Sequence, residues 1–159
     1  MGDDMTVRLG DGMINLRVGA IITKDDRVLM VRNPVEDWYY SVGGRIQFGE
    51  TAEQAVVREV REELGVELEI DRLGFITENY FYGTMGDNTG RLIYELCFYF
   101  YMRAPEAFRP NCDSITVNEH TEYIEWVPFD TSKTVYPAFF KTELSKPWKE
   151  LRHFVVDER

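Results

Sequence analysis

The chain has 159 residues, 44% of them hydrophobic, so it suits a single compact domain over residues 1–159 with a substantial core. Its 28 acidic and 18 basic residues give a net charge of −10, which excludes a protein held to nucleic acid by bulk positive charge. The two cysteines, Cys97 and Cys112, lie far apart in no metal-binding spacing, so neither a disulfide framework nor a zinc site is expected.

The location of the protein is predicted from what its sequence lacks. The opening segment MGDDMTVRLG is acidic and has no apolar stretch, so we expect neither a secretion signal nor a transit peptide. The longest apolar run, around Leu96 to Met102, is too short to span a membrane. We therefore expect a cytoplasmic protein with no membrane partner and no stable nucleic-acid partner.

The first predicted elements are strands. Residues 14–23 and 27–32 are expected to pair as a hairpin, because the turn-forming residues 24–26 lie between them. Residues 33–37 contain a proline and are expected to form a loop. A short strand over 39–42 then leads into two consecutive glycines.

A helix is predicted over residues 52–64, where the spacing of apolar residues changes to 3.6. Thr51 is a favourable N-cap, and Gln54 three positions later completes a capping box. Gly65 is well placed to end the helix. The apolar side of the helix carries Val56, Val57, Val60 and Leu64.

After this helix the chain returns mainly to strands. Strands dominate the sequence as a whole, with one strong helix in the middle, so the expected fold class is α/β in the broad sense (α+β), a mixed sheet covered by helices. The remaining predicted elements are strands at 67–82, 91–103, 123–127 and 153–156, and a short helix from Pro137 to Leu144.

Three carboxylates fall on one face of the predicted helix. At about 100° per residue, Glu63 lies about 40° and Glu62 about −60° from Glu59. Like charges at this spacing destabilise a helix by about 0.2–0.5 kcal/mol per pair. A hard divalent cation would offset the repulsion, because carboxylate oxygens are its preferred ligands. The helix spacing alone leaves open the alternative of an acidic face that is only solvated and binds no metal.

The segment GGRIQFGETAEQAVVREVREELGV, residues 43–66, resembles the signature of the Nudix (MutT-like) hydrolase family. All fixed positions match with the spacing intact over residues 44–66, and a chance match at so many positions is very improbable. Many family members have a proline where Val42 precedes the glycines, which should alter only the loop. The matching residues are Gly44, Glu50, Arg58, Glu59, Val60, Glu62, Glu63, Gly65 and Val66.

The resemblance implies a Nudix-type β-α-β sandwich with a mixed central sheet and one catalytic helix. It also implies hydrolysis of a phosphoanhydride bond in a nucleoside diphosphate linked to another moiety. By the same resemblance, Glu59, Glu62 and Glu63 bind Mg²⁺, with Mn²⁺ as a substitute. Glu50 lies near the metal ions or bonds to Arg58, and Arg58 holds the glutamates in place. Metal ions supply the polarised phosphorus and activated water that this chemistry needs.

A further carboxylate is expected outside the signature, because family members often recruit one from a loop before a late strand. The stretch VNEHTEYIEW offers several acids, and we favour Glu119 as general base or extra metal ligand. Glu122 is the second candidate, and a glutamate of the helix over 52–64 stays open as the general base. A solvated loop acid with no catalytic role remains the alternative for both.

Four residues near the signature are candidates for substrate binding. Trp38 and Tyr39 have aromatic faces that stack on nucleobases in many proteins. Arg32 and Arg45 carry guanidinium groups that match phosphate oxygens. Ordinary packing of the aromatic residues and surface exposure of the arginines remain the alternatives.

The substrate itself is left open among nucleoside triphosphates, dinucleoside polyphosphates and nucleotide sugars. Relatives that hydrolyse ADP-ribose tend to have a proline about sixteen residues past the signature, and this chain has none between Val66 and Ala104. Tyr82 stands at the distance where dinucleoside polyphosphate hydrolases tend to have a tyrosine. The competing functions are a catalytically silent nucleotide-binding module and a metal-free acidic interaction surface. A homodimer through the aromatic segment from Tyr80 to Tyr101 also stays open.

Overall fold

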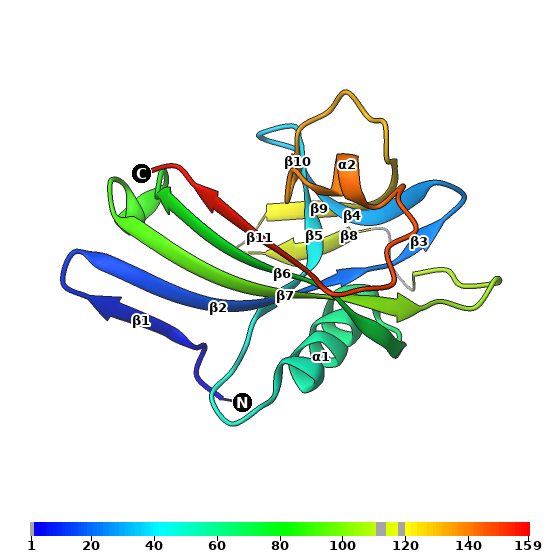
Figure 1. The fold of residues 1–159 in the computed structure, drawn as a ribbon, viewed down its shortest axis with the longest axis horizontal. Helices are drawn as coiled ribbons and strands as arrows, with labels where there is room; N and C mark the ends of the chain where they lie inside the picture. The colour runs from blue at the N-terminus through cyan, green and yellow to red at the C-terminus, as the bar shows by residue number, and fades with distance from the viewer. Residues whose placement is uncertain (1, 111–113, 118–119) are drawn as a thin grey trace.

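The strands form one continuous mixed sheet with a helix on each face (Figure 1). The computed structural model describes residues 2–110, 114–117 and 120–159. The helices are α1 (Ala52–Leu64), α2 (Phe140–Glu143) and the 3-10 turn η1 (Gly86–Asn88). The strands are β1 (Thr6–Leu9), β2 (Gly12–Ile21), β3 (Thr23–Lys24), β4 (Arg27–Asn33), β5 (Trp38–Arg45), β6 (Glu69–Tyr82), β7 (Leu92–Arg103), β8 (Ser114–Val117), β9 (His120–Pro128), β10 (Val135–Tyr136) and β11 (Arg152–Asp157).

The main path of the sheet runs β11-β6-β7-β2-β5-β4-β9-β8, with β1 beside β2, β3 beside β4 and β10 beside β5. The pairs β2–β7, β6–β11 and β5–β10 are parallel, and the other pairs are antiparallel. The predicted α+β class with a mixed sheet is therefore confirmed.

A separate hydrophobic core lies on each face of the sheet. The core to which a strand residue belongs therefore shows which face its side chain points to. Val56, Val60 and Leu64 of α1 are fully buried in the first core. Burial of each such side chain contributes about 1.5–3 kcal/mol. Val42 of β5 belongs to this core, whereas Tyr39 belongs to the second core beneath α2. Because successive strand residues point to opposite faces, even-numbered residues of β5 face α1 and odd-numbered ones face α2.

The structure differs from the predicted elements where strands are short or exposed. Strand β1 was not predicted, and its residues are mostly exposed and show no alternation of burial. Nor were β8 and the two-residue β10 predicted. The helix predicted from Pro137 is only Phe140–Glu143, because the residues before it form a turn in which Phe140 N donates to Pro137 O at 3.2 Å.

Two further observations concern the expectations about membranes and cysteines. In the described part of the chain, no helix is long and apolar enough to cross a membrane. Cys97 is buried in the core beneath α2, while Cys112 lies outside the described residues.

Candidate active site

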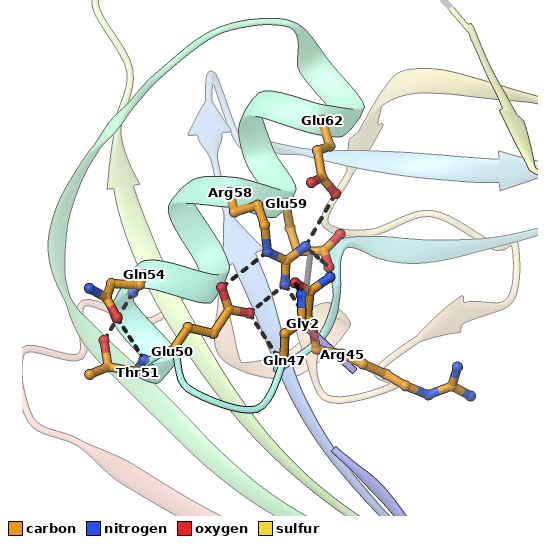
Figure 2. Close-up of polar contacts among 9 residues, drawn as sticks. All are labelled: Gly2, Arg45, Gln47, Glu50, Thr51, Gln54, Arg58, Glu59 and Glu62. Atoms are coloured by element: carbon orange, nitrogen blue, oxygen red, sulfur yellow. Dashed lines mark hydrogen bonds and ion pairs between the residues drawn. The ribbon is translucent and has the colours of Figure 1, made fainter. Parts of the chain in front are cut away.

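Helix α1 begins and ends where its capping residues predicted. Gln54 N donates to the Thr51 hydroxyl at 3.2 Å, and Thr51 N donates to the Gln54 amide oxygen at 2.9 Å, which completes the capping box (Figure 2). At the other end, Gly65 adopts a left-handed conformation with φ of 67°, and its N–H bonds to Arg61 O at 3.0 Å. These local contacts set where the helix begins and ends, and so determine which side of it carries the acidic residues.

The Arg58 guanidinium lies at the centre of the acidic cluster (Figure 2). It contacts Glu50 at two points, Nη2 to Oε1 at 2.6 Å and Nε to Oε2 at 3.1 Å. Its Nη1 also donates to Glu59 at 2.7 Å and to Glu62 at 3.2 Å. The remaining Nη2 proton reaches the carbonyl oxygen of Arg45 at 3.0 Å. Arg58 therefore ties helix α1 to the end of β5.

Glu50 is fully engaged by this arrangement. Besides Arg58, it accepts a hydrogen bond from Gln47 N at 2.8 Å. The bond from Arg58 holds the pKa of Glu50 below its ordinary value. Both carboxylate oxygens of Glu50 thus have partners. Of the two roles that the sequence left open for Glu50, this favours the bond to Arg58 over direct metal binding.

Glu59 packs against the backbone of β5, whereas Glu62 is more open to solvent. Their side chains are 13% and 55% exposed, respectively. A Cβ atom at Gly44 would lie 2.4 Å from a carboxylate oxygen of Glu59, so a larger residue there would require this carboxylate to move. Burial raises the pKa of Glu59, and the bond from Arg58 partly offsets that effect.

Glu63 is also held by the backbone of β5. Its Oε2 accepts a hydrogen bond from Gly43 N at 3.0 Å. Burial raises the pKa of Glu63 to about 8, and the negative charges of Glu59 and Glu122 add to this effect. The bond from Gly43 and the positive charge of Arg17 oppose it. In the absence of a cation, this carboxyl group is therefore partly protonated near neutral pH.

Glu122 reaches the cluster from β9 and is not a solvated loop acid. It is only 8% exposed, and the hydroxyl of Tyr40 donates a hydrogen bond to it. Burial and this bond raise the pKa of Tyr40 far above its ordinary value, so the hydroxyl remains a donor. Glu119, the candidate that the sequence favoured, lies outside the described residues, and its role stays a prediction.

The donor chemistry of the cluster fits a hard cation. Glu59, Glu62 and Glu63 supply carboxylate oxygens, the preferred ligands of Mg²⁺. No three histidine, cysteine or acidic side chains in the described ranges surround one point closely enough to hold a metal ion. Arg58 accounts for this arrangement, since its guanidinium serves as the positive partner of both Glu59 and Glu62.

Two of the four predicted substrate contacts point to the face of the sheet away from α1. Arg32 and Tyr39 are cross-strand neighbours on that face. Both bind Glu125, Arg32 through Nε at 2.8 Å and Tyr39 through its hydroxyl at 2.8 Å. The Arg32 guanidinium also lies over the Tyr123 ring, 5.0 Å from its centroid. Their predicted contacts with substrate remain untested, but both side chains already have protein partners.

The other two candidates lie at the two ends of β5. Trp38 points to the α1 face, where its ring contacts Tyr40 and Tyr136 at centroid distances of 5.6 and 5.4 Å. Arg45 follows Gly44 directly and pairs with Asp4 at 3.5 Å. Figure 2 shows its guanidinium directed away from the glutamates.

The comparison with family models decides which family this site represents. The model described as the NUDIX domain matches residues 13–144, which includes the glycine loop, α1 and Glu122. The chain belongs to the Nudix family. The resemblance seen in residues 44–66 thus extends over most of the chain.

Curated Nudix relatives match mainly around this segment. The NAD-capped RNA hydrolase NudC of Pseudomonas aeruginosa is 44% identical over 63 residues, which is 38% of this chain and 21% of that protein. The ADP-ribose pyrophosphatase of Methanocaldococcus jannaschii is 42% identical over 52 residues, 31% of each chain. The matches therefore cover less than a third of either relative.

Solved Nudix structures share the fold. The MutT protein from Bacillus halodurans superposes with a TM-score of 0.65 and covers 91% of both chains at 20% identity. At that level of identity, the likeness concerns the fold alone, and it agrees with the mixed sheet and the mid-chain helix described above.

In this Nudix chain, Tyr40 was not among the predicted site residues, and Glu122 was only the second candidate for the general base. Alternation along β5 was the signal that would have found Tyr40. Gly44 must face α1 to leave room for Glu59, and Tyr40 is four residues earlier on the same face. The signal for Glu122 was weaker, because it depends on the pairing of β9 with β4.

Arg58→Lys is expected to weaken the binding of Mg²⁺ and to lower turnover, each by about tenfold to a hundredfold, the range for residues that orient metal ligands. Lysine keeps the charge but lacks the planar fork that contacts Glu50 at two points. The measurement is turnover as a function of Mg²⁺ concentration. Arg61→Lys, on the same helix but exposed, is the matched control and should behave like wild type. Equal behaviour of the two variants would reject the orienting role.

Proposed function

We propose that this Nudix chain is a Mg²⁺-dependent pyrophosphohydrolase, with Mn²⁺ as an alternative cation. Its substrate would be a nucleoside diphosphate linked to another moiety, cleaved at a phosphoanhydride bond. The observation that carries the proposal is the carboxylate cluster of α1 and β9. Glu59 and Glu122 lie close enough to Glu63 to help raise its pKa to about 8. Buried acids with such perturbed pKa values are typical of functional sites.

Glu59, Glu62 and Glu63 would hold the cation. A bound divalent ion polarises phosphoryl oxygens and lowers the pKa of water, which is the chemistry that diphosphate hydrolysis requires. For these acids to act as ligands, Glu59 and Glu62 would have to turn away from Arg58. Arg58 would keep its two-point contact with Glu50, so the loop before α1 would stay in position.

The general base would be a carboxylate outside the signature. Glu122 has a defined position, because its carboxylate is buried and accepts the hydroxyl hydrogen of Tyr40. Its charge contributes to the raised pKa of Glu63, so it is close to the proposed ligands. Glu119 remains the other candidate for this role. Either acid would accept a proton from the attacking water.

The substrates that the chain itself favours are nucleoside triphosphates, dinucleoside polyphosphates and nucleotide sugars. Trp38 is the aromatic candidate that lies on the α1 face, together with Tyr40 and Tyr136. The absence of a proline between Val66 and Ala104 argues against ADP-ribose. The names of the curated relatives extend the range to be tested to NAD-capped RNA and ADP-ribose.

A hydrolysis screen tests the reaction class. We expect nucleotide products from at least one of these substrates when Mg²⁺ or Mn²⁺ is present, and none when a chelator is in excess. Full activity in chelator would reject the metal-dependent mechanism. Saturable nucleotide binding with no product from any substrate would instead identify the silent binding module that the sequence left as the alternative.

A further inference from the structure

Strand β11 forms one edge of the sheet and is bonded on one side only, to β6 (Figure 1). Natural proteins usually blunt such edges with lysine, proline or a bulge, because an open edge accepts a further strand. The centre of β11 has none of these devices. It reads Phe154-Val155-Val156, and Val155 and Val156 are 59% and 43% exposed. Among the described strands, none covers this edge.

The outer edge of β11 presents a regular row of unpaired backbone groups. In a parallel pair, alternate residues of a strand direct both N–H and C=O to the same neighbour. Glu158 N donates to Tyr80 O at 2.9 Å, so residues in phase with Glu158 face β6. The backbone groups of His153, Val155 and Asp157 therefore point away from β6. Each offers one donor and one acceptor to an incoming strand.

The sequence of β11 is complementary to itself when read in the opposite direction. In an antiparallel pair centred on Val155, Arg152 faces Glu158 and His153 faces Asp157 of the second copy. Phe154 then faces Val156 in the same way. Opposite charges and apolar residues directly across such a pair are both stabilising. Every position from 152 to 158 thus meets a compatible partner.

The backbone pattern selects the same register. Centring the pair on Val155 places the outward-facing residues His153, Val155 and Asp157 opposite one another in both copies. A slip by one residue would pair outward groups with groups already bonded to β6. The neighbouring registers that keep the backbone pattern place Phe154 opposite itself or opposite Glu158, and both lose the charge pair of Arg152 with Glu158 and the pairing of His153 with Asp157.

We propose that this chain forms a homodimer by antiparallel addition of β11 to β11, which joins the sheets of two copies. The ion pairs that His153 and Asp157 make within one copy do not oppose it. His153 binds Glu78 at 2.8 Å and Asp157 binds Arg159, and both pairs are exposed. Exposed ion pairs contribute little and can rearrange.

The dimer is expected to be of modest affinity. A contact between two edge strands is smaller than the about 1,600 Å² buried in a typical stable interface. We therefore expect a dissociation constant in the micromolar range. At micromolar protein concentrations, monomers and dimers should both be present. Sedimentation velocity of the full chain, from about 1 to about 100 µM, should show this exchange.

Charge reversal distinguishes this specific pairing from nonspecific association. Arg152→Glu places glutamates opposite each other twice in the dimer, and Glu158→Arg places arginines opposite each other twice. Each variant alone should raise the dissociation constant at least about tenfold. An equal mixture should form heterodimers with near-wild-type affinity, because both cross-strand pairs then have opposite charges.

Two valines on opposite edges of the sheet supply the matched control. Val155→Lys should abolish dimers, because lysine at the centre of an edge strand opposes strand addition. Val7→Lys on β1, where the valine is 52% exposed, should leave the dimer intact. Thermal melts would verify that both variants are folded. A wild-type protein that is monomeric at about 100 µM, or equal mass distributions for the two lysine variants, would overturn the proposal.

Discussion

Glu63→Gln is expected to abolish turnover and to make the metal-free protein more stable than wild type at pH 8. The substitution keeps size and helix propensity nearly unchanged, and an amide oxygen can still accept the bond from Gly43 N. What it removes is a buried charge. Burial raises the pKa of Glu63 from its ordinary 4.5 to about 8, so ionising it in the folded protein is unfavourable.

The pH dependence has a defined sign. Because the folded pKa of Glu63 is raised, its contribution to stability is fully present below pH 4.5 and is lost as pH rises to about 8. The unfolding free energy of wild type should fall over this window, relative to Glu63→Gln, and the difference should level off above it. Chemical unfolding in chelator at pH 4.5, 6 and 8 would measure this difference.

Magnesium should reverse the order of stability. A ligand that binds only the folded state adds about 2.7 kcal/mol at a hundred times its dissociation constant. Wild type should gain this stabilisation from Mg²⁺, and Glu63→Gln should gain much less. Glu67→Gln, an exposed acid just past α1, is the control and should retain the wild-type response. An active Glu63→Gln enzyme with an undiminished Mg²⁺ effect would contradict the assignment of Glu63 as a ligand.

Glu122→Gln is expected to lower turnover by about two to four orders of magnitude, the range for loss of a general base, with little change in substrate affinity. The buried position of Glu122 and its bond from Tyr40 motivate this expectation. Tyr40→Phe removes only the hydroxyl that orients Glu122, so its turnover should fall less. Steady-state kinetics at saturating Mg²⁺ would separate turnover from affinity.

The control for Glu122 lies on the same strand. Glu125 points to the opposite face of the sheet, where it binds Arg32 and Tyr39, so Glu125→Gln should leave turnover near wild type. Glu119→Gln tests the competing candidate in the same assay. If Glu119→Gln loses activity by this amount and Glu122→Gln does not, the base is Glu119 and the bond from Tyr40 has no catalytic role.

Local signals in the sequence predicted helix α1 to the residue. Its caps, Thr51 with Gln54 at one end and Gly65 at the other, act within a few positions of the chain. The signature residues could be matched for the same reason, since their spacing is carried by one loop and one helix. The contact of Arg58 with Glu50 was among the roles that the family resemblance offered.

The features that the sequence could not predict depend on pairing and packing between distant segments of the chain. Strand β1 alternates polar and apolar residues over only four positions, most of them exposed, and it is held in the sheet by its pairing with β2. Alternation along β5 places the adjacent Tyr39 and Tyr40 on opposite faces, and the packing of β5 between two cores decides which of them faces α1. The position of Glu122 depends in the same way on the pairing of β9 with β4.

The position of Arg58 also bears on how the protein matures. Many small metal-binding domains cannot fold until their ion arrives, because repulsion among the ligands opposes the native state. Here a guanidinium already lies among the acids and contacts Glu50, Glu59 and Glu62, and its single positive charge offsets part of their mutual repulsion. We therefore expect the newly made chain to reach its native structure without metal and to bind the proposed cation afterwards. Removal of that cation is then expected to stop turnover reversibly while the protein stays folded.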